Sequence, residues 1–236
     1  MNWIVLIFWI VVIGGIAAQV VIFIYRSIKD NKRLQILFDN DPDGYILEMK
    51  RRIEKDEEDK KPPLWFWYSN LAVAYSNKGE FVKAIELLKA IPFDEEKNHV
   101  ANLLTAFNIS NISFKTGDYK TAMMYYEKLK AIRGKISAKR RLATADMLIA
   151  MLQAEVDFHH GNYDAVMSFC KKQLESESDT KIRAFMQFLS ARVYEKIGDT
   201  NKQIACLEYV AEHSNVLYIA NDAREKLRDL KRVIYD

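Results

Sequence analysis

The side chains best suited to chemistry in this sequence are the adjacent pair His159 and His160 and the two cysteines, Cys170 and Cys206. Imidazole and thiolate together could bind zinc. Adjacent residues on a helix point about 100° apart, however, so the two imidazoles cannot share one face as metal ligands do. The cysteines are too few and too far apart for a zinc ribbon or a disulfide framework. We therefore predict no metal site, place the histidines at a helix C-terminus, and expect both thiols to be buried and reduced.

Other catalytic signatures are missing from the sequence. No nucleophile motif surrounds any serine, histidine or aspartate, and there is no phosphate-binding or dinucleotide-binding glycine loop. The formal net charge of +3 is too small to indicate a nucleic-acid partner. The sequence favours a protein that is not an enzyme and has no cofactor. Turnover of a substrate by residues 64–236 would support the alternative.

The composition indicates which elements carry these residues. The 236 residues include only four prolines and eight glycines, too few for the frequent turns of an all-β protein. Half of the residues (50%) are apolar, enough for one domain with a sizeable core. The predicted fold class is all-α, built from long helices.

One short pattern occurs four times, as KGEFVKAIELL from Lys78, TGDYKTAMMYY from Thr116, HGNYDAVMSFC from His160 and IGDTNKQIACL from Ile197. Each copy has a glycine between two stretches of helical apolar periodicity, and successive glycines are 38, 44 and 37 residues apart. Glycine can adopt the left-handed conformation that ends one helix before the next begins. The pattern predicts four helical hairpins in series.

The hairpins resemble the tetratricopeptide repeat (TPR) over about residues 64–212, which implies an α-solenoid. The first two units carry most of the family's aromatic and small positions, namely Tyr68, Leu71, Ala72, Tyr75, Gly79, Phe81, Ala84 and Leu88, then Ala106, Ile109, Gly117, Tyr119, Ala122, Tyr126 and Leu129. The last two units are degenerate, because Val166 and Gln203 replace a small alanine. The long interval of 44 residues between Gly117 and Gly161 predicts a first helix of the third unit from Ser137 to His159, with Ser137 as its N-cap.

The resemblance also implies a partner-binding surface, because such solenoids bind peptides or helices along the concave face of their first helices. The inward positions in this sequence are Asn70, Val73, Asn77, Phe107, Asn111, Phe114, Met151, Glu155, Phe158, Phe188, Arg192 and Glu195. The lysines of the family's carboxylate clamp are missing, so we predict no clamp and an aromatic groove for an amphipathic peptide. The alternative is that several of the phenylalanines belong to the core.

A cluster of basic residues lies between the second and third units. Arg133, Lys135, Lys139, Arg140 and Arg141 form this basic patch, with Lys128 and Lys130 nearby. Contact with anionic lipid or an acidic partner is one interpretation. The favoured interpretation is a solvated loop and helix start.

The sequence also predicts a membrane anchor. Trp3–Tyr25 contains no charged residue and, as a helix, would span about 34 Å, enough for a hydrocarbon core of about 30 Å. Four basic residues follow the span and none precedes it, so the positive-inside rule places the rest of the chain in the cytoplasm. Gly14 and Ala18 could pack two anchors into a homodimer.

Residues 30–63 form a charged neck after the anchor and basic flank (residues 1–29). Asp41 and Pro42 could start a short helix with an apolar stripe at Tyr45, Ile46, Met49 and Ile53. That helix could dock on the domain or on lipid, but a solvated spacer is the favoured interpretation. Residues 213–236 have one apolar stripe and are predicted to cap the solenoid.

Together these features predict a single-pass membrane protein, with a bacterial origin, whose TPR domain faces the cytoplasm. It would act as a scaffold or adaptor that binds a protein or peptide and holds it at the membrane, in assembly or quality control. The alternative is an extracytoplasmic envelope-assembly chaperone with the reverse topology.

Overall fold

The computed structural model describes residues 29–38, 40–59, 65–93, 99–176, 179–214 and 217–235, and all regular secondary structure in these ranges is helical. The all-α prediction is confirmed, and the helices are consistent with an α-solenoid. The anchor predicted at Trp3–Tyr25 lies outside the described residues. No helix within the described ranges combines the length and apolar character needed to cross a membrane. The chain divides into two compact units, residues 1–45 and 46–236.

In the first unit, residues 29–38 are helical and Phe38 packs against the edge of Tyr45, with ring centroids 5.1 Å apart. Helix α2 (Pro42–Glu58) begins in this unit. The carboxylate of Asp41 accepts a hydrogen bond from the Gly44 N–H at 2.9 Å. This is the N-cap that the sequence predicted, and it satisfies a backbone donor that the helix itself leaves unpaired.

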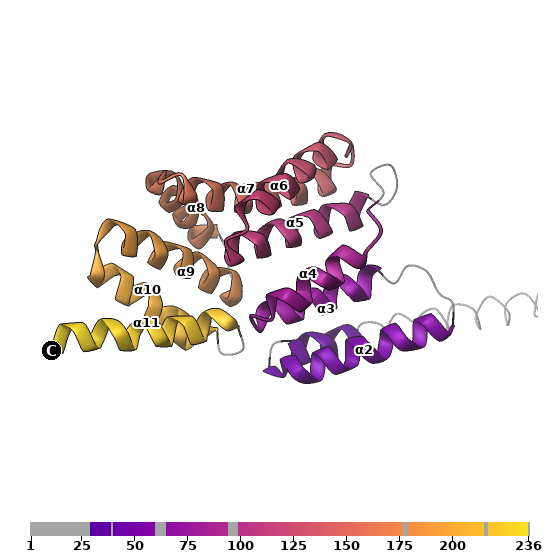
Figure 1. The fold of residues 1–236 in the computed structure, drawn as a ribbon, viewed down its shortest axis with the longest axis horizontal. Coiled ribbons are helices and arrows are strands. Elements are labelled where there is room, and N and C mark those ends of the chain that lie inside the picture. The colour runs from indigo at the N-terminus through magenta and orange to yellow at the C-terminus, as the bar shows by residue number, and fades with distance from the viewer. Residues whose placement is uncertain are drawn as a thin grey trace, which may run out of the picture. The chain divides into compact units, whose positions relative to one another are not determined.

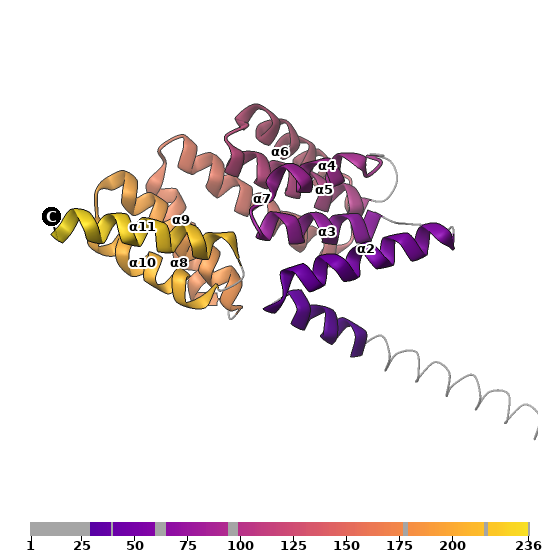
Figure 2. The same cartoon turned by 60° about the horizontal axis from the view of Figure 1, so that its bottom comes forward.

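Residues 46–58 of α2 belong to the second unit, where they run alongside α3 (Trp65–Asn77) (Figure 2). Ile46, Met49 and Ile53 are buried. The Trp67 indole donates a hydrogen bond to Asp56 at 2.7 Å, and the Arg52 guanidinium lies 5.1 Å from the Trp67 ring centroid. The favoured interpretation of this segment as a solvated spacer is therefore wrong, because its apolar stripe is buried rather than hydrated.

Four helical hairpins make up most of the second unit (Figure 1). They pair α3 with α4 (Phe81–Ala90), α5 (His99–Thr116) with α6 (Tyr119–Gly134), α7 (Lys139–His159) with α8 (Tyr163–Ser176), and α9 (Thr180–Ile197) with α10 (Thr200–His213). Helix α11 (Tyr218–Tyr235) follows, and its Ile219, Ala223 and Leu227, with Leu217 just before it, are buried in a shared core with α9 and α10. This burial covers the apolar face that the last hairpin would otherwise expose.

The turn of each hairpin has the predicted glycine conformation. The φ angles of the four turn glycines are 81°, 79°, 78° and 76°, a region that disfavours residues with a Cβ. In the second and fourth hairpins the following aspartate caps the next helix, since Asp118 accepts from the Thr121 N–H and Asp199 from the Lys202 N–H, each at 3.1 Å. Glycine thus ends the first helix and aspartate starts the second.

The side chains at the helix crossings are small in the first two hairpins and larger in the last two. Ala72 and Ala84 of the first hairpin, and Ala106 and Ala122 of the second, have no exposed surface. At the corresponding position of the later hairpins, Val166 is completely buried and Gln203 is buried to 5% exposure. The predicted N-cap of α7 is wrong, because the helix begins at Lys139 and its N-cap residue, Ala138, makes no side-chain cap hydrogen bond.

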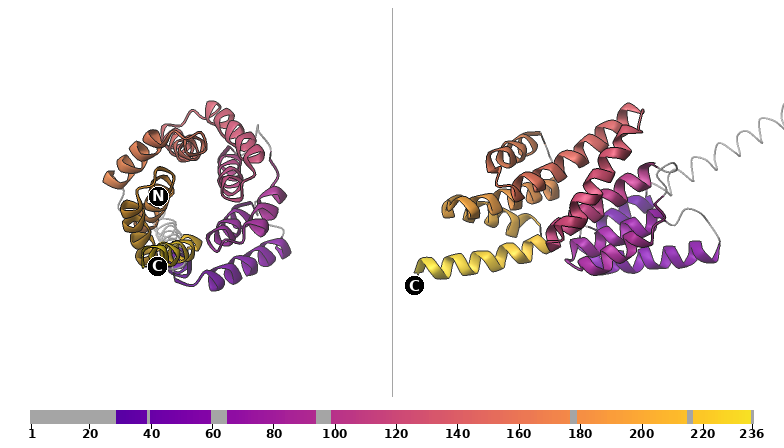
Figure 3. Two further views of the ribbon diagram at one scale, coloured as in Figure 1. Left: turned by 60° about the vertical axis from the view of Figure 1, so that its left-hand side comes forward. Right: turned by 45° about the horizontal axis from the view of Figure 1, so that its top comes forward.

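The start of α11 returns to the turn of the first hairpin (Figure 3). The Tyr218 and Phe81 rings meet edge to face, with centroids 5.2 Å apart. A Cβ atom built on Gly79 would lie 3.3 Å from the Cβ of Tyr218. Elements more than 130 residues apart in sequence are therefore in contact, and Tyr218 bridges the first hairpin and α11.

Candidate functional site

The first helices of the four hairpins enclose a cavity of about 270 Å³, which Tyr218 and Phe169 help to close. Its walls are mostly apolar and include three aromatic rings of the first helices, Phe107, Phe185 and Phe188. Its polar groups are Ser76, Asn77, Asn108, Asn111, Lys115, Glu155 and Arg192. An apolar cavity with a few converging polar groups is the usual form of a ligand-binding site.

Helical periodicity explains why these side chains meet. On α5, Phe107, Asn111 and Lys115 are spaced four residues apart and so lie on one face of the helix. On α9, Phe185, Phe188 and Arg192 form the equivalent stripe by three- and four-residue steps. The stacking of α5, α7 and α9 turns these stripes toward the same cavity.

An ion pair crosses the cavity wall between α7 and α9. The Arg192 guanidinium donates from Nη1 to both carboxylate oxygens of Glu155, at 2.9 and 3.0 Å. The same guanidinium lies 4.1 Å from the centroid of the Phe158 ring. The two side chains are only 24% and 14% exposed, so salt screens this pair less than it screens a surface ion pair.

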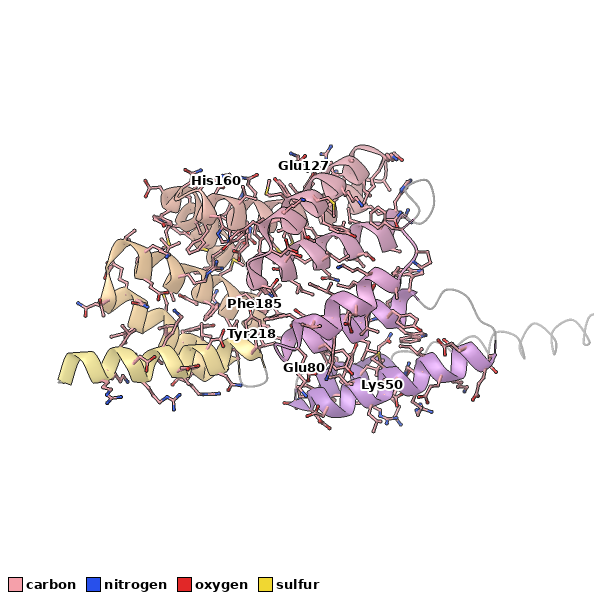
Figure 4. All side chains as sticks on the ribbon, viewed as in Figure 1. Lys50, Glu80, Glu127, His160, Phe185 and Tyr218 are labelled. Carbon is pink, nitrogen blue, oxygen red and sulfur yellow. The ribbon has the colours of Figure 1, made fainter. Side chains whose placement is uncertain are left out.

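Lys115 is the third charged residue of the cavity. Its ammonium lies 5.4 Å from the Phe185 ring centroid and 5.1 Å from that of Tyr218. Burial lowers the pKa of Lys115 to about 8, while the negative charge of Glu155 acts in the opposite direction. Loss of hydration disfavours the charged form, which explains the sign of the shift. Figure 4 shows Phe185 and Tyr218 next to each other.

Most of the residues assigned to the concave face from the sequence do line this cavity. They are Val73, Asn77, Phe107, Asn111, Met151, Glu155, Phe188 and Arg192. That they bind a partner stays a prediction.

The other four assigned residues do not line the cavity. Phe114 and Phe158 are buried in two core clusters, as the alternative interpretation held. Asn70 is turned back on its own helix, where its amide donates to the Phe66 carbonyl at 2.8 Å. Glu195 pairs with Lys226 of α11 at 2.8 Å. The assignment of Phe114 and Phe158 to a binding surface is wrong, because both side chains are buried, whereas that of Asn70 and Glu195 stays a prediction.

Sequence reasoning missed three residues that shape the cavity. Lys115 and Phe185 extend the predicted stripes of α5 and α9 by one helical turn, so continuing the same periodicity would have found them. Tyr218 comes from α11 and carries no such signal in the sequence. Its position depends on the return of α11 to the first hairpin.

The basic patch is partly neutralised by neighbouring acids. Arg133 binds Asp146 through Nε at 2.7 Å and Nη2 at 3.3 Å. Lys135, Lys139 and Arg141 are exposed, and the side chain of Arg140 lies outside the described part of the structure. Neighbouring Lys130 binds Glu127 at 3.0 Å. A role for this patch in lipid or partner contact stays untested.

Cys170 is buried as predicted, but Cys206 is only half-buried, and of the two adjacent histidines His159 packs into the protein while His160 is exposed. The His159 ring stacks on Phe114 with centroids 5.5 Å apart and meets the edge of Tyr119 at 4.2 Å. Burial lowers the pKa of His159 and raises that of Cys170 to about 11. Within the described ranges, no three His, Cys, Asp or Glu side chains are grouped closely enough to hold a metal ion.

Comparison with known proteins gives one match. The tetratricopeptide repeat family matches residues 105–135, which cover most of α5, the turn at Gly117 and all of α6. No curated protein and no solved structure matches the chain. The match falls on the second hairpin, whose first helix supplies Phe107, Asn111 and Lys115 to the cavity, and a repeat of this kind indicates a protein-interaction scaffold.

Proposed function

We propose that the protein binds a segment of a partner protein in the cavity between its first helices. The observation that supports this most strongly is the cavity itself, where aromatic rings and asparagine amides from separate hairpins converge. Amide side chains can bond the backbone of an extended peptide, while the rings accept its apolar side chains.

Photo-crosslinking in cells tests the proposal. A photoreactive phenylalanine analogue at Phe188 should capture a partner, because this partly exposed side chain lines the cavity. The matched control places the analogue at Val82 on α4, which is 72% exposed and does not line the cavity. Capture of the same proteins at both positions, or at neither, would contradict binding in the cavity.

We further propose that residues 3–25 tether the chain to a membrane as a single span, with the repeats in the cytoplasm. The uncharged run and the basic residues that follow it support this topology. The tethered scaffold would hold its partner at the membrane during assembly or quality control, and Gly14 and Ala18 would allow a homodimer. Activity of an export-dependent phosphatase fused to the C-terminus would instead favour the extracytoplasmic chaperone.

A further inference from the structure

Lys115 is a cation without a carboxylate partner in the cavity. Among the described residues, no aspartate or glutamate forms an ion pair with it, and its ammonium lies near the rings of Phe185 and Tyr218. Aromatic faces attract an ammonium but replace only part of its lost hydration. The Lys115 ammonium is therefore a positive charge in the cavity that a negatively charged ligand would neutralise.

The other two charged groups of the cavity are paired with each other. Both oxygens of Glu155 accept hydrogen bonds from Arg192, so the carboxylate is already engaged. With Lys115 protonated, the three groups carry a net charge of +1. Electrostatic complementarity therefore favours a ligand that brings one negative charge.

We propose that the cavity binds an acidic peptide segment, with an apolar side chain among the aromatic rings and a neighbouring Asp or Glu carboxylate paired with Lys115. This inference rests on the proposed peptide-binding function and specifies its ligand. Asn77, Asn108 and Asn111 beside the rings supply amide groups for the peptide backbone. The pair with Lys115 is a charge-assisted hydrogen bond in a partly desolvated site, which is stronger than a pair on the surface.

The proposal predicts that binding depends on pH in one direction. Pairing with a carboxylate favours the protonated form of Lys115, so binding is unimpaired below its free pKa of about 8 and weakens above it. From the protonated fraction, affinity falls about tenfold between about pH 7 and 9.

The other titratable groups in and around the cavity do not account for this weakening of binding at high pH. Burial raises the pKa of Tyr218 well above this range, so its phenol stays neutral. Burial lowers the pKa of His159, which is therefore neutral throughout the same range. Glu155 and Arg192 are hydrogen-bonded to each other, and α3 contributes only Val73, Ser76 and Asn77 to the cavity.

An array of acetylated and amidated hexapeptides, probed with the detergent-solubilised full chain, tests the proposal. We expect bound peptides to be enriched in Asp or Glu next to Phe, Leu or Met. Replacing the selected Glu by Gln should weaken binding at least tenfold at pH 7. The Lys115→Met chain should lose this preference for the acid while it keeps the preference for the apolar residue.

Controls separate this inference from the function on which it rests. Lys130→Met removes a surface lysine paired with Glu127 and should leave the preference for acid unchanged. Acidic preference that survives in the folded Lys115→Met chain would overturn the inference alone, as would binding that requires a free C-terminal carboxylate. Failure of both chains to bind any peptide would overturn the proposed function as well.

Discussion

The contact between α11 and the first hairpin can be tested with two glycine substitutions that differ in one respect. Gly79 and Gly117 occupy equivalent turns, with φ angles of 81° and 79°. A Cβ at position 79 would lie 3.3 Å from Tyr218 Cβ, whereas a Cβ at position 117 would meet no atom within 4 Å. Gly79→Ala therefore perturbs the turn and the contact with α11, and Gly117→Ala perturbs the turn alone.

The expected magnitudes follow from these geometries. An alanine in the left-handed conformation costs about 1 kcal/mol relative to glycine, so both variants should lose about this much stability. At position 79 the added methyl must also displace Tyr218 or the turn by a few tenths of an ångström. Crowding of this kind adds about 1 kcal/mol, which brings the total for Gly79→Ala to about 2 kcal/mol.

Urea unfolding followed by circular dichroism measures the difference between the variants. We expect a lower midpoint for Gly79→Ala than for Gly117→Ala. Peptide binding should weaken only in Gly79→Ala, because Tyr218 is part of the cavity wall. Equal midpoints and equal binding would refute the conclusion that this contact supports the site.

Three further predictions concern the core, an ion pair and a thiol. Leu129→Ala should destabilise the protein by about 3 kcal/mol because the side chain is completely buried, while Leu47→Ala, at 69% exposure, should change the urea midpoint little. A hydrogen bond from Arg51 lowers the pKa of Glu48 to about 2. The ionised carboxylate therefore stabilises the fold fully above about pH 5, and this contribution is lost as the pH falls toward 2. Glu48→Gln should remove that part of the pH dependence of the free energy of unfolding. Burial raises the pKa of Cys170 to about 11, so in the native chain it should react with iodoacetamide at pH 8 far more slowly than in urea, and equal rates would show that the α8 core opens readily.

Phe114 and Phe158 were predicted on the concave face but lie in the core, which shows that periodicity alone does not fix which side of a helix faces the cavity. Phe114 follows Asn111 by three residues and Lys115 follows it by four, so their side chains diverge by about 100° around α5. The sequence pattern is compatible with either Phe114 or Lys115 on the side of the helix that faces the cavity. Packing of Phe114 against His159 and Tyr119 decides the outcome, because it buries Phe114 in the core and leaves Lys115 at the cavity. Charged substitutions at the two phenylalanines would consequently test folding rather than binding.

The sequence by itself determined the local structure of the repeats. Turn glycines, capping aspartates and small residues at the helix crossings depend on backbone conformation and on neighbours within one hairpin, so their spacing predicted the hairpins. The tertiary structure alone decided that Tyr218 meets Phe81 and Gly79, and that Lys115 faces two rings while Arg192 holds Glu155. These contacts join residues from different repeats, and they depend on how small rotations between successive hairpins add up along the solenoid. The apolar periodicity of a single helix does not determine these rotations, so the sequence pattern could not predict the contacts.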